Sequence, residues 1–123
     1  MVIGENPSYS FKVIIMPKYE VIKDQRTALN TNIAAGVSEE LISGTYSAPH
    51  FNSLLVTNRD VVDIRITLDN MAVAGRVYDV PKLSALIIEP DEDIRFHTVV
   101  QTNLDAAVAE TADKIRVTAM YRE

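Results

Sequence analysis

The feature that most constrains the fold of this chain is a strict alternation of apolar and polar residues. Residues 62–68 read Val-Asp-Ile-Arg-Ile-Thr-Leu, so every second side chain is apolar. Because successive side chains of a β-strand point to opposite faces, this segment predicts a strand with one buried and one solvated face. Residues 114–122 repeat the pattern with a single departure at Met120. Half-buried strands of this kind are typical of antiparallel sheets.

Further segments have the composition of strands but a less regular pattern: Ser10–Met16, Tyr19–Lys23, Asn52–Thr57, Arg76–Val80, Leu83–Glu89 and 94–101. The run Ser10–Met16 is mostly apolar and is closed by Pro17, and this pattern indicates a strand buried on both faces. Tyr19–Lys23 would continue it after a bend.

The segment 94–101 gives an ambiguous pattern. Phe96 and Thr98 alternate with His97, but Val99 interrupts the alternation. We expect Phe96 to face the core and His97 to lie on the surface.

Turn-forming residues separate these segments. Asn, Asp and Pro gather at 68–71, 89–93 and 103–105, between apolar runs. Turns that recur at intervals of roughly ten residues are expected of a sandwich or barrel. We therefore predict an all-β fold, an antiparallel β-sandwich or barrel with short irregular or helical turns, in a single domain spanning residues 1–123.

Two stretches lack a clear period and are expected to be irregular. In Thr27–Leu41, Ser38 could cap a short helical turn, with the carboxylates of Glu39 and Glu40 near its positive end. Ala106–Ala112 could be one helical turn or a loop. The wider segment 27–47 is interpreted as an extended loop or arm.

Composition excludes several classes of function. The chain of 123 residues has a net charge of −5 and scattered basic residues, which argues against a nucleic-acid partner. It contains no cysteine, so disulfides, thiolate catalysis and cysteine-ligated metals are excluded. The N-terminal residues lack the pattern of a signal peptide, and no apolar run approaches the length of a membrane span. We expect a chain made in the cytoplasm, with no membrane partner.

No motif for catalysis or metal binding is found. The two histidines, His50 and His97, are far apart in sequence and lack neighbours at ligand spacing. The acidic run Glu89–Asp93 could hold calcium, but it lacks the spacing of a calcium loop and is better interpreted as a solvated hairpin tip. We expect no catalytic residue, no cofactor and no metal, and hence no enzyme.

Aromatic residues leave a binding role open. Sugar-binding sandwiches stack a sugar on an exposed aromatic ring, usually that of Trp, and this chain has no Trp. A small-ligand or carbohydrate-binding module would show a concave face with exposed Tyr46, Tyr78 or His97. A cupin-like enzyme would need a cluster of His and Glu, and with two histidines the usual three-histidine metal site cannot be built within one chain.

The second half of the chain resembles small virion proteins of tailed phages, including head decoration proteins. The resemblance covers about half the chain and lies in these segments, as they stand in this sequence: Leu55–Asn58, Asp63–Asn70, Tyr78–Pro81, Ile94–Phe96, Val99–Asn103 and Ala112–Val117. It implies a sandwich of jelly-roll type that docks on a capsid or tail surface, often as a trimer. No catalytic residue is implied. The segment Thr27–Ser47 has no counterpart in this pattern.

On this basis we expect a non-enzymatic structural module of a virion, such as a capsid decoration protein, that self-associates as a homotrimer and contacts other virion proteins. Pairing of exposed edges across a symmetric interface would protect a sandwich of this size. The apolar but unpatterned stretch 28–37 is the expected subunit contact, through Ala28, Leu29, Ile33 and Val37. The alternative that it packs as a loop on its own domain stays open.

Overall fold

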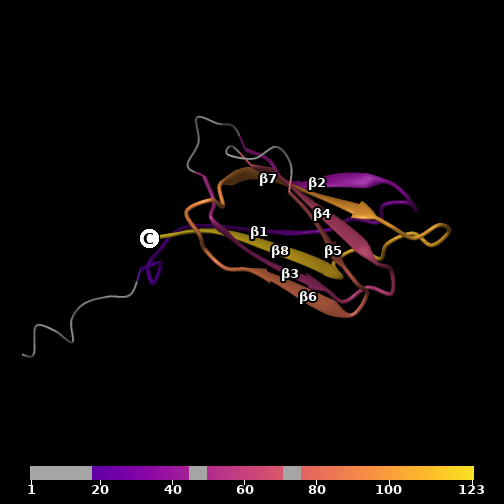
Figure 1. Ribbon diagram of the computed structural model, residues 1–123. Helices are drawn as coiled ribbons and strands as arrows, with labels where there is room; N and C mark the ends of the chain where they lie inside the picture. Colours follow the sequence, from indigo (N-terminus) through magenta and orange to yellow (C-terminus); the bar gives the residue numbers. More distant parts are fainter. Residues whose placement is uncertain (1–17, 45–49, 71–75) are drawn as a thin grey trace, which may run out of the picture.

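The computed structural model describes residues 18–44, 50–70 and 76–123. These ranges contain eight strands, and none of the described residues lies in a helix (Figure 1). The expected strand Ser10–Met16 lies outside them. The strands are β1 (Ile22–Leu29), β2 (Ser38–Ile42), β3 (Ser53–Asn58), β4 (Ile64–Asn70), β5 (Arg76–Val80), β6 (Ser84–Ile88), β7 (Phe96–Asn103) and β8 (Ile115–Arg122).

The strands form two four-stranded antiparallel sheets with the orders β1-β8-β3-β6 and β2-β7-β4-β5. Four antiparallel pairs, β1 with β8, β2 with β7, β3 with β6 and β4 with β5, nest inside one another along the chain. Such nesting results when a ribbon of paired strands is rolled into two facing sheets, the arrangement called a jelly roll. The predicted all-β fold, an antiparallel sandwich or barrel, is confirmed as a sandwich of two sheets, and the strand order is that of a jelly roll.

Alternate side chains of the two sheets meet between them to form the core. In β4, Ile64, Ile66 and Leu68 each expose 0% of their surface, while Arg65 is exposed on the other face. In β8, the alternate residues from Ile115 to Ala119 are buried in the same way. Both strands were predicted from their period of two, and both predictions are confirmed.

The segment that was expected to be irregular, Thr27–Leu41, is strand at both of its ends. Its first three residues complete β1, and its last four begin β2, so a helical turn at Ser38 is wrong. Strand β2 is held by β7, and the hydroxyls of Ser38 and Thr102 lie 2.7 Å apart although the residues are 64 positions apart in the sequence. Pairing with a strand so distant in the sequence outweighs the local preference of Ser38 for a helix cap.

The expected strand Tyr19–Lys23 begins later than predicted. Tyr19 lies in a turn with a φ of 69°, and β1 starts at Ile22. Val21 joins the sheet through paired backbone hydrogen bonds with Glu123, of 3.0 and 2.8 Å.

A β-bulge explains why the pattern of 94–101 is ambiguous. In the pairing of β4 with β7, Asp69 faces Thr98 and Asn70 faces Phe96, so His97 is an extra residue. Because a bulge shifts the alternation by one position, Phe96 and His97 are both buried, with 0% and 2% exposed. The prediction of a surface histidine is therefore wrong. Beyond the bulge Val99, Gln101 and Asn103 face inward, not Thr98 and Val100.

Gly44, two residues after the end of β2, packs against this bulge. A Cβ added to Gly44 would lie 2.6 Å from the carbonyl oxygen of His97, a backbone atom that cannot easily move. We expect Gly44→Ala to lower the free energy of unfolding by about 1–3 kcal/mol, the usual cost of overpacking. Urea titration measures this cost, with Ser43→Ala, an exposed neighbour, as control. A Gly44→Ala variant as stable as the parent would contradict the close contact.

Candidate functional site

Four connections meet at one end of the sandwich, which we call the loop end: residues 30–37, 59–63, 81–83 and 104–114. They meet there because antiparallel pairing places the end of each odd-numbered strand beside the start of an even-numbered one. In Figure 1 this end lies on the right, away from the label that marks the C-terminus.

Large apolar side chains are exposed on or beside these connections. Their exposed fractions range from 37% for Leu104 to 70% for Leu83. Burying such side chains against a partner is favourable in proportion to the apolar area removed from water. The set consists of Leu29, Val37, Val61, Leu83, Leu104 and Val108.

Buried asparagines hold the backbone of the loop end in place. Asn58, at the end of β3, donates to the carbonyls of Val62, Val80 and Pro81 at 3.0, 3.3 and 3.2 Å. Asn103, at the end of β7, donates to the carbonyl of Val108 at 2.9 Å. Each amide thus replaces strand pairing where the sheet ends, and loops fixed in this way lose little entropy when they bind.

Asn30 joins two of the four connections. Its Oδ1 accepts hydrogen bonds from the backbone N–H groups of Lys114 and Ile115, both at 3.0 Å. Its Nδ2 donates to the carbonyl of Thr111 and to Oε1 of Glu110, also at 3.0 Å. The connection 30–37 is therefore tied to the connection 104–114 through one buried side chain.

The connection 104–114 of the loop end carries a buried carboxyl group. Glu110 is 2% exposed, and its Oε1 accepts from Asn30 and, at 2.7 Å, from Nε2 of Gln101. The other oxygens of this bonded pair, Oε2 of Glu110 and Oε1 of Gln101, are buried acceptors with no donor among the residues described. Burial raises the pKa of the Glu110 carboxyl above its ordinary value, and the nearby carboxylates of Asp60 and Glu39 act in the same direction.

This pKa shift predicts the direction of a pH effect. A carboxyl group whose pKa is raised by folding stabilises the folded state at any pH below its pKa in the unfolded chain. This stabilisation is lost as the pH rises through its pKa in the folded state. Glu110→Gln replaces the carboxyl with an amide that supplies a donor. In mildly alkaline buffer we expect its free energy of unfolding to exceed that of the parent by about 1–3 kcal/mol. Urea titrations over a range of pH test this, with the exposed Glu89→Gln as control. An unchanged pH profile in Glu110→Gln would contradict the assignment.

The residues predicted as a subunit contact fall at the loop end. Leu29 and Val37 are each 44% exposed, whereas Ala28 packs against the core and Ile33 is half-buried. Ile33 accepts a backbone hydrogen bond from Glu110 at 2.9 Å. Whether these residues contact another subunit stays a prediction. The sequence analysis did not predict the other exposed apolar residues at the loop end. The asparagines that end the strands were, however, a visible signal of the buried hydrogen bonds that hold its backbone.

Two of the three residues predicted as a ligand face lie within the described ranges, and neither of these two is fully exposed. His97 is buried, Tyr78 is half-buried on β5 and packs against the core, and Tyr46 lies outside the described residues. His50 is half-buried, with its ring 5.0 Å from that of Tyr121. Burial, together with Arg95 and His97, lowers the pKa of His50, so its imidazole is neutral at physiological pH.

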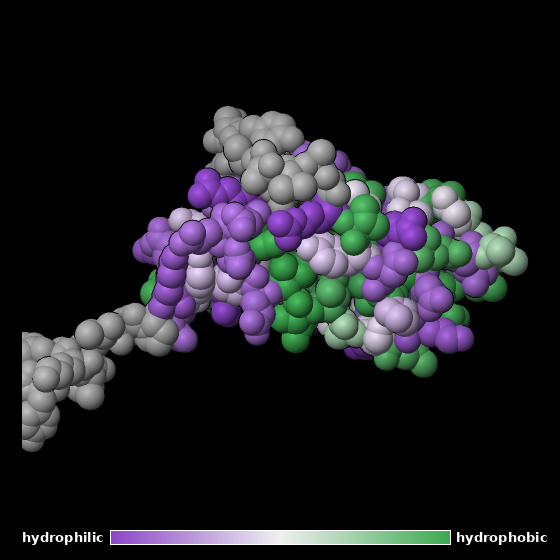
Figure 2. Space-filling model, viewed as in Figure 1, coloured by the Kyte–Doolittle hydropathy of each residue, from purple (hydrophilic) through white to green (hydrophobic). Residues whose placement is uncertain are grey.

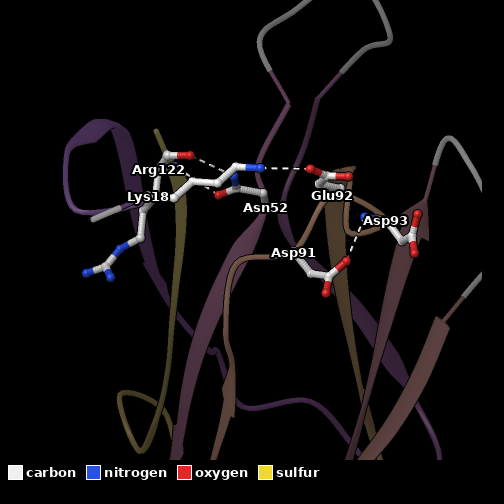
Figure 3. A network of polar contacts seen from close by, with 6 residues as sticks. All are labelled: Lys18, Asn52, Asp91, Glu92, Asp93 and Arg122. Carbon is white, nitrogen blue, oxygen red and sulfur yellow. Dashed lines mark hydrogen bonds and ion pairs between the residues drawn. The ribbon is translucent and has the colours of Figure 1, made fainter. Parts of the chain in front are cut away.

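The acidic run lies at the opposite end of the sandwich, in a polar network (Figure 3). Oδ1 of Asp91 accepts from the backbone N–H of Asp93 at 2.9 Å, and Glu92 forms an ion pair of 2.7 Å with Lys18. Nearby, Asn52 exchanges two hydrogen bonds with the backbone of Arg122. Within 18–44, 50–70 and 76–123, no three His, Cys, Asp or Glu side chains are grouped to hold a metal ion.

A search for membrane-spanning helices among the described residues and two comparisons with known proteins each find nothing. In the part of the chain that the structure describes, there is no helix with the length and apolarity that crossing a bilayer requires. No protein-family model matches the sequence, and the comparison with curated proteins gives no match.

Proposed function

We propose that this chain is a non-enzymatic structural module that self-associates through its loop end, as a component of a virus particle such as a capsid decoration protein. The observation that carries the proposal is that the loop end combines two features. Its apolar side chains are exposed, and its backbone is held by buried hydrogen bonds. A surface of this kind is prepared for association, because little freedom remains to be lost on binding.

The architecture supports the same role. Jelly rolls occur in viral capsid domains, lectins and cupins, so the topology admits a particle protein without selecting one. The sequence resemblance to phage virion proteins favours the first of these classes, and it implies a trimer in contact with other virion proteins. A closed trimer would cover the apolar side chains of the loop end at its axis.

Light scattering on a sizing column, across a tenfold dilution, tests the self-association. We expect a particle with three times the chain mass of 13.7 kDa. The double variant Val37→Glu/Val108→Glu places charges at the loop end and should elute as a monomer. Its matched control is Val77→Glu, because Val77 is 53% exposed but lies in β5, outside the loop end.

Three outcomes would contradict the proposal. A parent that is monomeric at every concentration would argue against self-association. It would direct a screen of small ligands and sugars to the surface around Tyr78. Dissociation by Val77→Glu alone would move the interface away from the loop end, and an oligomer that survives Val37→Glu/Val108→Glu would do the same.

A further inference from the structure

The two sheets differ in the chemistry of their outer faces. On the outer face of β1-β8-β3-β6, Leu55 and Ile87 are direct cross-strand partners, 36% and 68% exposed. Ala85 continues this apolar strip along β6, and Leu83, 70% exposed, follows at its end. In Figure 2 apolar residues gather over this sheet.

In the row of residues that contains Leu55, the strip does not extend beyond β3. Along the row that contains Leu55, the neighbours on β8 and β1 are Thr118 and Thr27, whose hydroxyls lie 3.2 Å apart. The opposite sheet carries polar pairs on its outer face, such as Arg65 with Asp79 at 2.8 Å. The apolar strip is therefore a local feature of β3 and β6.

A groove of about 440 Å³ opens at one end of the strip. Leu55 and Ile87 line it from the sheet, and Lys18 and Tyr19 line it from the chain that precedes β1. Lys18 is held there by its ion pair with Glu92 and lies 5.0 Å from the Tyr19 ring. Lys18, the first residue that the structure describes, therefore lies at the rim of this groove.

The segment just before this point has the composition and length to cover the strip. Residues 10–16 read Ser-Phe-Lys-Val-Ile-Ile-Met, with one charge in seven residues. As an extended strand they would span about 23 Å, against about 16 Å for the five residues of β6. Among the described strands, β6 pairs with β3 only, so its other edge is open to a further strand.

We propose that Ser10–Met16 docks on the β3–β6 side of its own domain and covers Leu55 and Ile87. The chain leads from this segment to Lys18, which lines the groove at one end of the apolar strip, and both the segment and the strip are apolar. An apolar strip at an open edge is a hazard for aggregation, and a segment from the same chain would remove this hazard. Docking in this way is independent of the loop end and of self-association.

Disulfide trapping in the full chain tests the docking. The chain has no cysteine, so introduced pairs report without background. We would combine Ile87→Cys with Val13→Cys or with Ile14→Cys, because adjacent strand residues point to opposite faces. The matched control combines the same segment positions with Val77→Cys on the opposite sheet. We expect one Ile87 pair to oxidise within a single chain at least ten times faster than its control.

The readouts are the loss of free thiols and the migration of the chain on a non-reducing gel. A fast bond within one chain supports the proposal. Fast bonds between chains would overturn it and assign the strip to a second copy. Equal rates for Ile87 and Val77, or slow oxidation of both Ile87 pairs, would also overturn it, because the segment would then have no preferred place on the domain.

Discussion

Replacing Ile66 with aspartate is expected to unfold the domain. Ile66 lies in the middle of β4, exposes 0% of its surface and belongs to the core between the two sheets. The substitution removes a buried aliphatic side chain, at a cost of about 2–5 kcal/mol, and leaves a carboxylate without a partner in an apolar environment. The total stability of a domain is about 5–15 kcal/mol, so this loss removes most of it or all of it.

The neighbouring residue provides the control. Arg65 is exposed on the opposite face of β4, where its guanidinium pairs with Asp79 at 2.8 Å. Exposed ion pairs contribute at most about 1 kcal/mol, so Arg65→Ser should melt close to the parent temperature. Circular dichroism during heating measures both variants. If Ile66→Asp melts with the parent, the register of β4 is wrong.

Replacing Asn30 with alanine is expected to cost about 3–5 kcal/mol. The side chain is 2% exposed and bonds to Lys114, Ile115, Thr111 and Glu110. Alanine leaves the buried N–H of Ile115 without this acceptor and takes a donor from the Glu110 carboxyl. Each buried polar group that loses its partner costs about 1–3 kcal/mol.

The loss should be visible in urea titration and, more locally, in amide hydrogen exchange. We expect faster exchange at Lys114 and Ile115 in Asn30→Ala under conditions where the rest of β8 remains protected. The exposed residue Asn32 supplies the matched control, because Asn32→Ala removes the same amide from the same connection. Equal stability of the two variants would show that the buried hydrogen bonds do not hold the loop end.

The strands that could be predicted from the sequence are those whose pattern depends only on their own residues. The alternation at 62–68 predicted the buried face of β4, because a half-buried strand must alternate whatever its neighbours are. The segments predicted at Asn52–Thr57, Arg76–Val80 and Leu83–Glu89 match β3, β5 and β6 to within one residue at each end. Burial on one face is recorded directly in the order of residue types.

Features that depend on a partner strand could not be predicted in this way. The residues Ser38–Ile42 form β2 only because β7 lies beside them, and their own composition suggested a helix cap. The burial of His97 follows from an extra residue in β7 relative to β4, which the sequence of β7 alone does not show. The stretch that contains Leu29 and Val37 was predicted as a subunit contact because it is apolar but unpatterned, whereas nothing in the sequence singled out Leu83 and Val108.

The sequence by itself determined that the chain folds into antiparallel strands around one core, because period-two burial is a local property. Only the tertiary structure decided the nesting of the strands, the bulge at His97 and the meeting of four connections above Asn30 and Glu110. These depend on hydrogen bonds between residues far apart in the chain, such as the 80 positions that separate Asn30 from Glu110. Pairing between distant segments lowers the free energy of both together. The sequence of one segment alone therefore does not indicate the pairing.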